Sequence, residues 1–229
     1  MVEFWQQTLS GIHWQLNGAM LLAWCAAAFW LWLIWPAVEL RLWLGDRAAQ
    51  RRTLVALLAV TALWLMHASV QPAMQLHFLA LVTLMLMLGW RLASVLLLLP
   101  ASFYCLLVLK SPAELGALML LGFWWPLFIA FVFYNRCFHI LPKHLFVFIF
   151  CGAFINAGLS QLSHELLWGL WLWWGRDYQV GVIWDNYWQL APLLAFPEAL
   201  LNGMAVTLLV VYKPEWLADY SDRVYLWKK

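Results

Sequence analysis

Charged side chains are scarce in this sequence. Asp, Glu, Lys and Arg make up 10% of its 229 residues, against roughly 25% in soluble domains. Hydrophobic residues account for 66% and the mean hydropathy is +0.80. Such a chain is solvated mainly by membrane lipid, and no polar tract remains for a second, aqueous domain. We therefore expect one transmembrane helical domain over residues 1–229, and the net charge of +2 gives no reason to expect nucleic-acid binding.

Several functional motifs are missing as well. The sequence has no GxxxxGK[ST] P-loop, so it cannot bind ATP in that way, and active transport would take its energy from a partner or a gradient. The pair His164-Glu165 lacks the second His, four residues after the first, that a zinc protease requires. We expect no catalytic residue and no organic cofactor, and therefore a protein that is not an enzyme.

Cysteine pairs and an N-terminal positive charge are absent too. The four cysteines form no CxxC motif, and we expect them to be small buried hydrophobic side chains. Residues 1–16 contain no Lys or Arg, so a cleavable signal peptide is not expected. Tryptophan, in contrast, is abundant at 19 residues. Many of these indoles lie near the ends of apolar runs, where they anchor at the lipid headgroups.

Long apolar runs separated by charge, Pro or Gly predict about seven transmembrane helices. These runs cover approximately 17–37, 53–70, 76–89, 91–109, 113–135, 144–172 and 190–212. The third run is short, and about 14 residues cannot cross a ~30 Å hydrocarbon core upright. We expect neighbouring helices to shelter it, or the run to line a cavity.

The distribution of cations predicts the orientation of the chain. With the N-terminus outside, the outer segments hold only Lys110 and Arg176. The inner segments then hold Arg41, Arg47, Arg51, Arg52, Arg91, Arg136, Lys143, Lys213, Arg223, Lys228 and Lys229. This bias follows the positive-inside rule and predicts a multi-pass protein of a bacterial-type inner membrane, N-out and C-in.

Ionisable residues gather at the predicted outer end. His67 and His77 bracket a Gln-Pro-Ala turn between two apolar runs. Intramembrane ionisable residues usually face the bundle interior, and imidazole and carboxylate ligands suit divalent nickel, cobalt, zinc or copper. The candidate metal ligands are His67, His77, His13, His164, Glu165 and Glu198. The alternative is that each His bonds a helix carbonyl or lies in the wet interface.

Glu198 lies inside the last apolar run, directly after Pro197. A lone charge in oil is too costly, so this carboxylate must be solvated, paired or protonated. We expect it to face the bundle, close to the sixth run or to the short third run. It would either bond exposed backbone around the third run or serve as a metal ligand.

The first apolar run offers a surface of small residues. Ala19, Ala23 and Ala27 recur at four-residue spacing, which allows another helix to approach closely. That face is either packed within the chain or docks a partner membrane subunit. Ahead of it, residues 1–16 predict a short amphipathic helix that either lies in the outer interface or folds back to cover the outer cavity.

The last run and its exit, "FPEALLNGMAVTLLVVYKPEWL", resemble the C-terminal span of the CbiM/NikM family. These are the cobalt and nickel substrate-capture components of energy-coupling-factor (ECF) transporters. The shared features are Glu198-Ala199, Gly203 and the exit Lys213-Pro214-Glu215. The stretch "LHFLALVTLMLMLGW" resembles the family's short, His-led span and puts His77 at the position of its interior metal-binding His. The start Met1-Val2-Glu3-Phe4 departs from the family's Met-His-Ile-Pro, which completes the metal site there.

This resemblance implies seven spans, N-out and C-in, and a membrane-embedded, S-component-like subunit for uptake of a divalent transition-metal ion such as cobalt or nickel. Its partners would be a coupling membrane subunit and cytoplasmic ATPases. The alternative is a CbiM-like fold that binds a non-metal ligand, organic or lipidic, or acts as a scaffold, with histidines that are merely interfacial.

Overall fold

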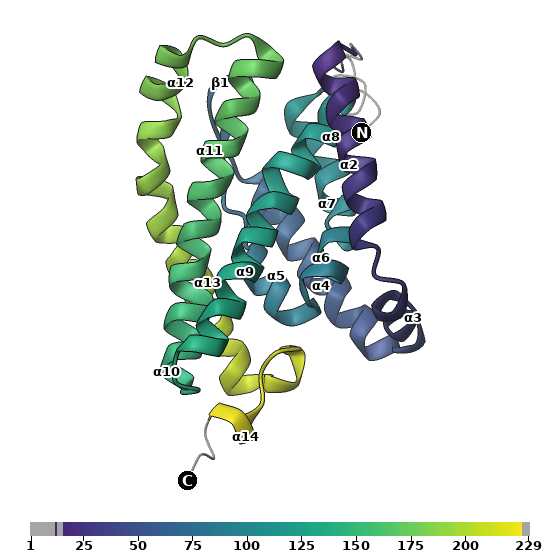
Figure 1. Cartoon of the computed structure of the whole chain (residues 1–229), viewed down its shortest axis with the longest axis vertical. Coiled ribbons are helices and arrows are strands. Elements are labelled where there is room, and N and C mark those ends of the chain that lie inside the picture. The colour runs from purple at the N-terminus through teal and green to yellow at the C-terminus, as the bar shows by residue number, and fades with distance from the viewer. Residues whose placement is uncertain (1–11, 13–15, 226–229) are drawn as a thin grey trace, which may run out of the picture.

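The computed structural model describes residue 12 and residues 16–225, and it is an elongated bundle of helices (Figure 1). The N-terminal half contains α2 (Gly18–Ile34), α3 (Ala37–Gly45), α4 (Arg47–Leu65), the strands β1 (Ala68–Gln71) and β2 (Met74–Leu76), α5 (Leu81–Leu88), α6 (Trp90–Leu96), α7 (Leu98–Tyr104) and η1 (Cys105–Leu109). The C-terminal half contains η2 (Pro112–Glu114), α8 (Leu115–Ala117), η3 (Leu118–Trp124), α9 (Trp125–Ile140), α10 (Leu145–Val147), η4 (Phe148–Ile155), α11 (Asn156–Arg176), α12 (Val180–Asn186), η5 (Trp188–Leu190), α13 (Ala191–Tyr212), η6 (Pro214–Trp216) and α14 (Asp222–Tyr225). The chain is therefore an all-α membrane protein with one small hairpin, and the predicted fold class is confirmed.

Five continuous helical stretches are long and apolar enough to cross a membrane. They are Arg47–Leu65, Trp90–Leu109, Pro112–Ile140, Leu145–Arg176 and Val180–Tyr212. A sixth arises if α2 and α3, which are bent by 71° at a short break, count as one broken span. The exact number of seven spans and their orientation stay predictions.

The third apolar run differs from the prediction of one short span. Only Leu81–Leu88 of that run is helical, and the chain ahead of it forms the antiparallel hairpin of β1 and β2. Two residues explain the change of structure. Ala73 in the turn and Ala80 before α5 both have positive φ values, 64° and 53°, which an α-helix cannot accommodate. The predicted turn is present, and the strands on either side of it were not predicted.

The hairpin and α5 together carry the chain from one end of the bundle to the other. At one end, Tyr178 donates a hydrogen bond to the Pro72 carbonyl. At the other end, the Ala218 N–H donates to the Leu86 carbonyl at 2.8 Å. Figure 1 shows the same division, with α12 and β1 at one end and α3, α10 and α14 at the other. The hairpin and α5 thus replace the short third span.

The two ends of the bundle carry different ion pairs. Arg176 donates from Nε to the buried Glu114 carboxylate at 2.6 Å, at the same end as the hairpin turn. At the opposite end, Arg91 lies 3.8 Å from Glu39, and Asp46 caps α4 by accepting from the N–H groups of Ala49 and Ala48. These bonds, from Ala49 first, lower the pKa of the Asp46 carboxyl below its usual value. The predicted inner cations Arg52 and Arg91 therefore share one end, away from Arg176.

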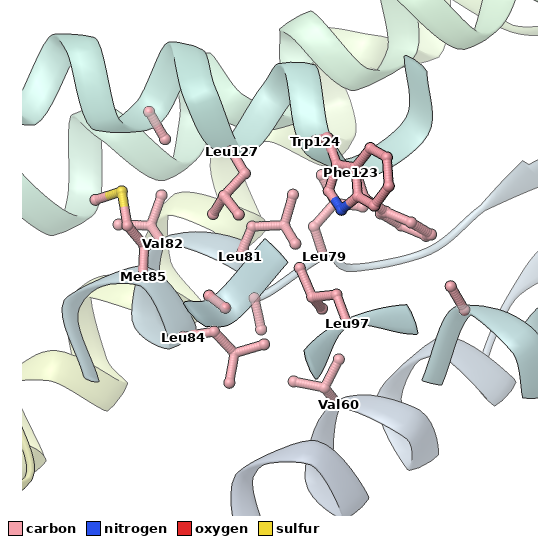
Figure 2. Close-up of a cluster of buried hydrophobic side chains, with 14 of the residues drawn as sticks. Val60, Leu79, Leu81, Val82, Leu84, Met85, Leu97, Phe123, Trp124 and Leu127 are labelled. Carbon is pink, nitrogen blue, oxygen red and sulfur yellow. The ribbon is translucent and has the colours of Figure 1, made fainter. Parts of the chain in front are cut away.

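The core is centred on α5. Five of its eight residues are buried: Leu81, Val82, Leu84, Met85 and Leu86. Figure 2 shows four of them, Leu81, Val82, Leu84 and Met85, among apolar side chains of α4, η3 and α9 and beside Leu97, which joins α6 to α7. A helix that is hydrophobic on all sides belongs in the interior. The short helix is therefore sheltered by its neighbours, as expected.

Small residues allow helices to pack closely around this core. Ala23 and Ala27 are buried in the core cluster, where α2 packs against α8 and η3. Packing within the chain, one of the two alternatives left open by the sequence, accounts for both side chains, and docking of a partner through the Ala19, Ala23 and Ala27 face stays a prediction.

The cysteines differ in burial. Cys105 is buried and Cys137 and Cys151 are half-buried, but Cys25 is exposed, against the expectation that all four are buried.

Candidate functional site

The backbone around residues 72–80 cannot form ladder bonds throughout, so side chains from several helices bond its carbonyl groups. The donors come from α4, α11 and the segment after α11. The bonds are Tyr178 Oη to Pro72 O at 2.9 Å, Trp168 Nε1 to Ala73 O at 3.0 Å, Gln161 Nε2 to His77 O at 3.4 Å and Trp64 Nε1 to Leu79 O at 3.1 Å. Irregular backbone inside a membrane bundle persists only where the protein satisfies it. This segment is therefore fixed as a rigid platform.

Glu198 and Asn202 of α13 hold the N–H side of the same segment. The Glu198 carboxylate accepts from Leu79 N at 3.0 Å and from Ala80 N at 2.7 Å. Asn202 donates to Glu198 Oε1 at 2.7 Å and accepts from Thr83 N at 3.0 Å. These N–H groups belong to the start of α5, which lacks intrahelical acceptors for them. The two side chains, four residues apart, are thus the N-terminal cap of α5, and Glu198 bonds the exposed backbone next to the third run, the first of the two roles expected for it.

The platform brings His77 to His164. Their ring centroids lie 5.4 Å apart, and the residues are 3% and 1% exposed. His77 Nδ1 lies 3.3 Å from the Phe78 carbonyl and His164 Nδ1 lies 2.6 Å from the Gly122 carbonyl. Because a carbonyl only accepts, Nδ1 must carry the proton in both rings, and the neutral imidazole then has its free lone pair on Nε2. Both rings are therefore set in the tautomer that metal-ligating histidines use.

Polar side chains surround the histidine pair. Gln161, which bonds the His77 carbonyl, also donates to Glu165 Oε1 at 2.8 Å. Tyr104 lies against His77 with ring centroids 4.8 Å apart. Within the described part of the chain, Gln161 Oε1 is buried without a hydrogen-bond partner, and the neighbouring Glu165 Oε2 and Tyr187 hydroxyl are buried without a hydrogen bond of good geometry. Buried polar groups normally have partners, so three such atoms in one cluster suit a polar ligand.

His67, another predicted ligand, does not join this pair. His67 is exposed, and its Nδ1 lies 3.0 Å from the Leu65 carbonyl. This is the alternative that the sequence left open for a histidine at a helix end. His13 lies outside the described residues. No group of three or more His, Cys, Asp or Glu side chains over residues 16–225 is arranged to hold a metal ion.

Sequence reasoning missed Gln161, Tyr187 and Asn202. A usable signal exists for two of them. Gln161 lies four residues before Glu165, and Asn202 lies four residues after Glu198. Residues at this spacing share one face of a helix, so a polar residue there marks the same buried face. Tyr187 lies in a short segment between helices, where the sequence gives no such pattern.

Comparisons with known proteins address the fold. No family model matches the chain, and no curated protein matches it in sequence. Among solved structures, the crystal structure of a truncated transition metal transporter is similar, with a TM-score of 0.59 and 16% sequence identity. The alignment covers 90% of this chain and 94% of that one. The chain thus shares the fold of this transporter over nearly its whole length.

Proposed function

We propose that this protein is a membrane-embedded substrate-binding subunit for uptake of a divalent transition-metal ion, such as cobalt or nickel. The observation that carries the proposal is the pair His77 and His164, both buried and both with the lone pair on Nε2. The similarity in fold to a transition metal transporter supports it, and so does the resemblance of the sequence to the CbiM/NikM family. A coupling membrane subunit and cytoplasmic ATPases in an inner membrane would be its partners.

The spacing of the two rings fits a shared ion. A metal bound at about 2.0–2.1 Å from an imidazole nitrogen lies ~3.2 Å from the ring centroid. Two such ligands at a tetrahedral angle would have centroids about 5.2 Å apart, against 5.4 Å in the structure. The separation of the two ring centroids is thus close to that of two imidazoles bound to one ion.

The remaining coordination would come from oxygen. Glu165 follows His164 on the same helix, and its Oε2 has no hydrogen bond of good geometry among the described residues. A rotation of this side chain would bring a carboxylate toward the pair. Imidazole and carboxylate together suit nickel, cobalt, zinc and copper. Two fixed nitrogens and one movable oxygen suit an ion that must be released again.

Metal analysis of purified protein tests the proposal. We expect about one nickel or cobalt ion per wild-type chain after loading and washing, and at least tenfold less in His77→Ala and in His164→Ala. The matched control is His139→Ala, because His139 is exposed and lies in α9, outside the cluster. Folding is checked by size exclusion and melting temperature. Equal metal content in all four proteins would sink the proposal.

A second candidate function is binding of a small polar organic ligand in the same cluster. It is favoured because, in the described residues, no third metal-ligating side chain is already arranged with the histidine pair to hold an ion. It is also favoured by the oxygens of Gln161, Glu165 and Tyr187, because the first two can accept hydrogen bonds from a ligand and the hydroxyl can donate or accept one. A folded wild-type protein that retains no metal at any loading would favour this function over metal uptake.

A further inference from the structure

An open apolar groove runs along the membrane-facing side of α4 and α13, away from the histidine cluster. Its volume is about 600 Å³, within the range of ~300–1,000 Å³ typical of ligand pockets. Its walls are residues of α4 and α13, and its floor is α5. The lining includes Ala59 and Leu63, Leu84 and Met87, and Ala205 and Leu208. The lining hydroxyl of Thr83 already donates to Asn202 at 2.8 Å, so the groove has an almost wholly apolar surface.

The groove arises from how the neighbouring helices pack. α4 packs against α3 and α7, whereas α13 packs against α11, η4 and α5. The side chains that face the space between α4 and α13 include the small residues Ala56, Ala59 and Ala205. The gap between α4 and α13 therefore leaves room for an apolar chain from the membrane.

One end of the groove is basic. The lining ends at Lys213 and Trp216, and an adjoining pocket that shares Val55 and Trp216 is lined by Arg51 and Arg52. Arg52 donates to the Glu215 carbonyl at 2.8 Å and lies 3.7 Å from the Asp46 carboxylate.

The acidic side chains at the basic end of the groove do not neutralise its positive charge. Lys213 lies 3.9 Å from Glu215, and Arg51 forms no ion pair with any residue that the structure describes. Three cations thus face two carboxylates, Asp46 and Glu215. Trp216 beside them is the kind of side chain that lies at the headgroup level.

We propose that this groove is a binding site for an anionic glycerophospholipid, with an acyl chain between α4 and α13 and the phosphate at Arg51 and Lys213. The length of the groove favours a lipid. On α13 the lining extends from Leu201 to Tyr212, which is about 16 Å at 1.5 Å per residue. That is the depth of one leaflet of a ~30 Å hydrocarbon core, whereas a partner's transmembrane helix would need a surface across both leaflets. Basic pockets between helices bind anionic headgroups.

Native mass spectrometry of detergent-purified protein, titrated with dioleoyl phosphatidylglycerol or dioleoyl phosphatidylcholine, tests this proposal. We expect one retained phosphatidylglycerol per chain and at least fivefold weaker retention of phosphatidylcholine. Arg51→Gln should weaken phosphatidylglycerol binding about fivefold, since one basic residue near a membrane surface contributes about that factor. Arg47→Gln, an exposed cation one turn earlier on α4 and outside the lining, is the control.

A second pair of variants tests the groove itself. Ala59→Trp fills it and should remove the retained lipid, whereas Ala62→Trp, on an exposed part of α4 outside the lining, should leave binding unchanged. Equal retention of the two lipids would overturn the proposal, and so would equal loss of lipid in Ala59→Trp and Ala62→Trp. Photocrosslinking from position 205 to a protein or to a second copy of this chain, in place of lipid, would overturn it as well.

Discussion

At the residue scale, the carboxylate of Glu198 holds together two helices that are far apart in the sequence. It accepts hydrogen bonds from Leu79 N, Ala80 N and Asn202 Nδ2. A buried donor that loses its acceptor costs about 1–3 kcal/mol, so we expect Glu198→Ala to lower the free energy of unfolding by roughly 3 kcal/mol or more. The measurement is the melting temperature of the purified protein. Glu198→Gln still offers one acceptor oxygen, so its melting temperature should lie between those of the wild type and Glu198→Ala.

The control for this prediction is Glu215→Ala. The Glu215 side chain is 59% exposed and pairs loosely with Lys213, and an exposed pair contributes only about 0–1 kcal/mol. Similar melting temperatures for Glu198→Ala and Glu215→Ala would show that the cap of α5 is incidental. A Glu198→Ala protein that melts normally but has lost metal would instead make Glu198 a ligand.

The sequence predicted part of this arrangement. A carboxylate inside an apolar run must find partners, which placed Glu198 toward the bundle and near the third run, and the structure confirms both. The choice of His77 and His164 as neighbours was not predictable in the same way. Those residues are far apart in the chain, and the hairpin that brings His77 inward depends on the local backbone at Ala73 and Ala80. Periodicity in an apolar run does not reveal such a change.

At the scale of elements, close packing between α11 and η5 depends on a glycine. A Cβ at Gly169 would overlap the indole of Trp188, which donates to the Glu165 carbonyl at 3.1 Å. Replacing Gly by Ala inside a helix normally gains about 1 kcal/mol, but overpacking costs about 1–3 kcal/mol. We expect overpacking to prevail, so Gly169→Ala should lower the melting temperature and weaken ligand binding at the adjacent cluster.

The matched variant for this element is Gly181→Ala in α12. A Cβ there would meet no atom within 4 Å, so only the helix propensity changes and the melting temperature should stay the same or rise. A rise in both variants would mean that Trp188 moves aside freely, and that α11 and η5 are not fixed to one another by this contact.

At the scale of the whole molecule, the ends of the bundle differ in charge and in contacts. Glu114 and Arg176 pair near the hairpin turn, while Arg52 and Arg91 lie near α3 and the C-terminal segment. Two cations of the predicted inner loops thus lie at the end of the bundle that contains α3, and the positive-inside rule predicts that this end faces the cytoplasm. In that orientation the hairpin, the histidine cluster and its Glu165 would face the outside, where the proposed function requires access to the ion.

Reporter fusions test this orientation. A reporter that is active only outside the cytoplasm should be active when fused after Trp174 and inactive when fused after Lys229, because the run over 190–212 would separate the two points. A fusion after Lys110 should be active, since Lys110 and Arg176 belong to the two predicted outer segments that carry cations.

The opposite pattern would mean that the protein has the reverse orientation in the membrane, with the basic end of the groove in the outer leaflet. Equal activity after Trp174 and Lys229 would show that α13 does not cross the membrane. Activity after Trp174 but not after Lys110 would mean an odd number of crossings between these points, and the path of α9 and α11 through the bilayer would have to be redrawn.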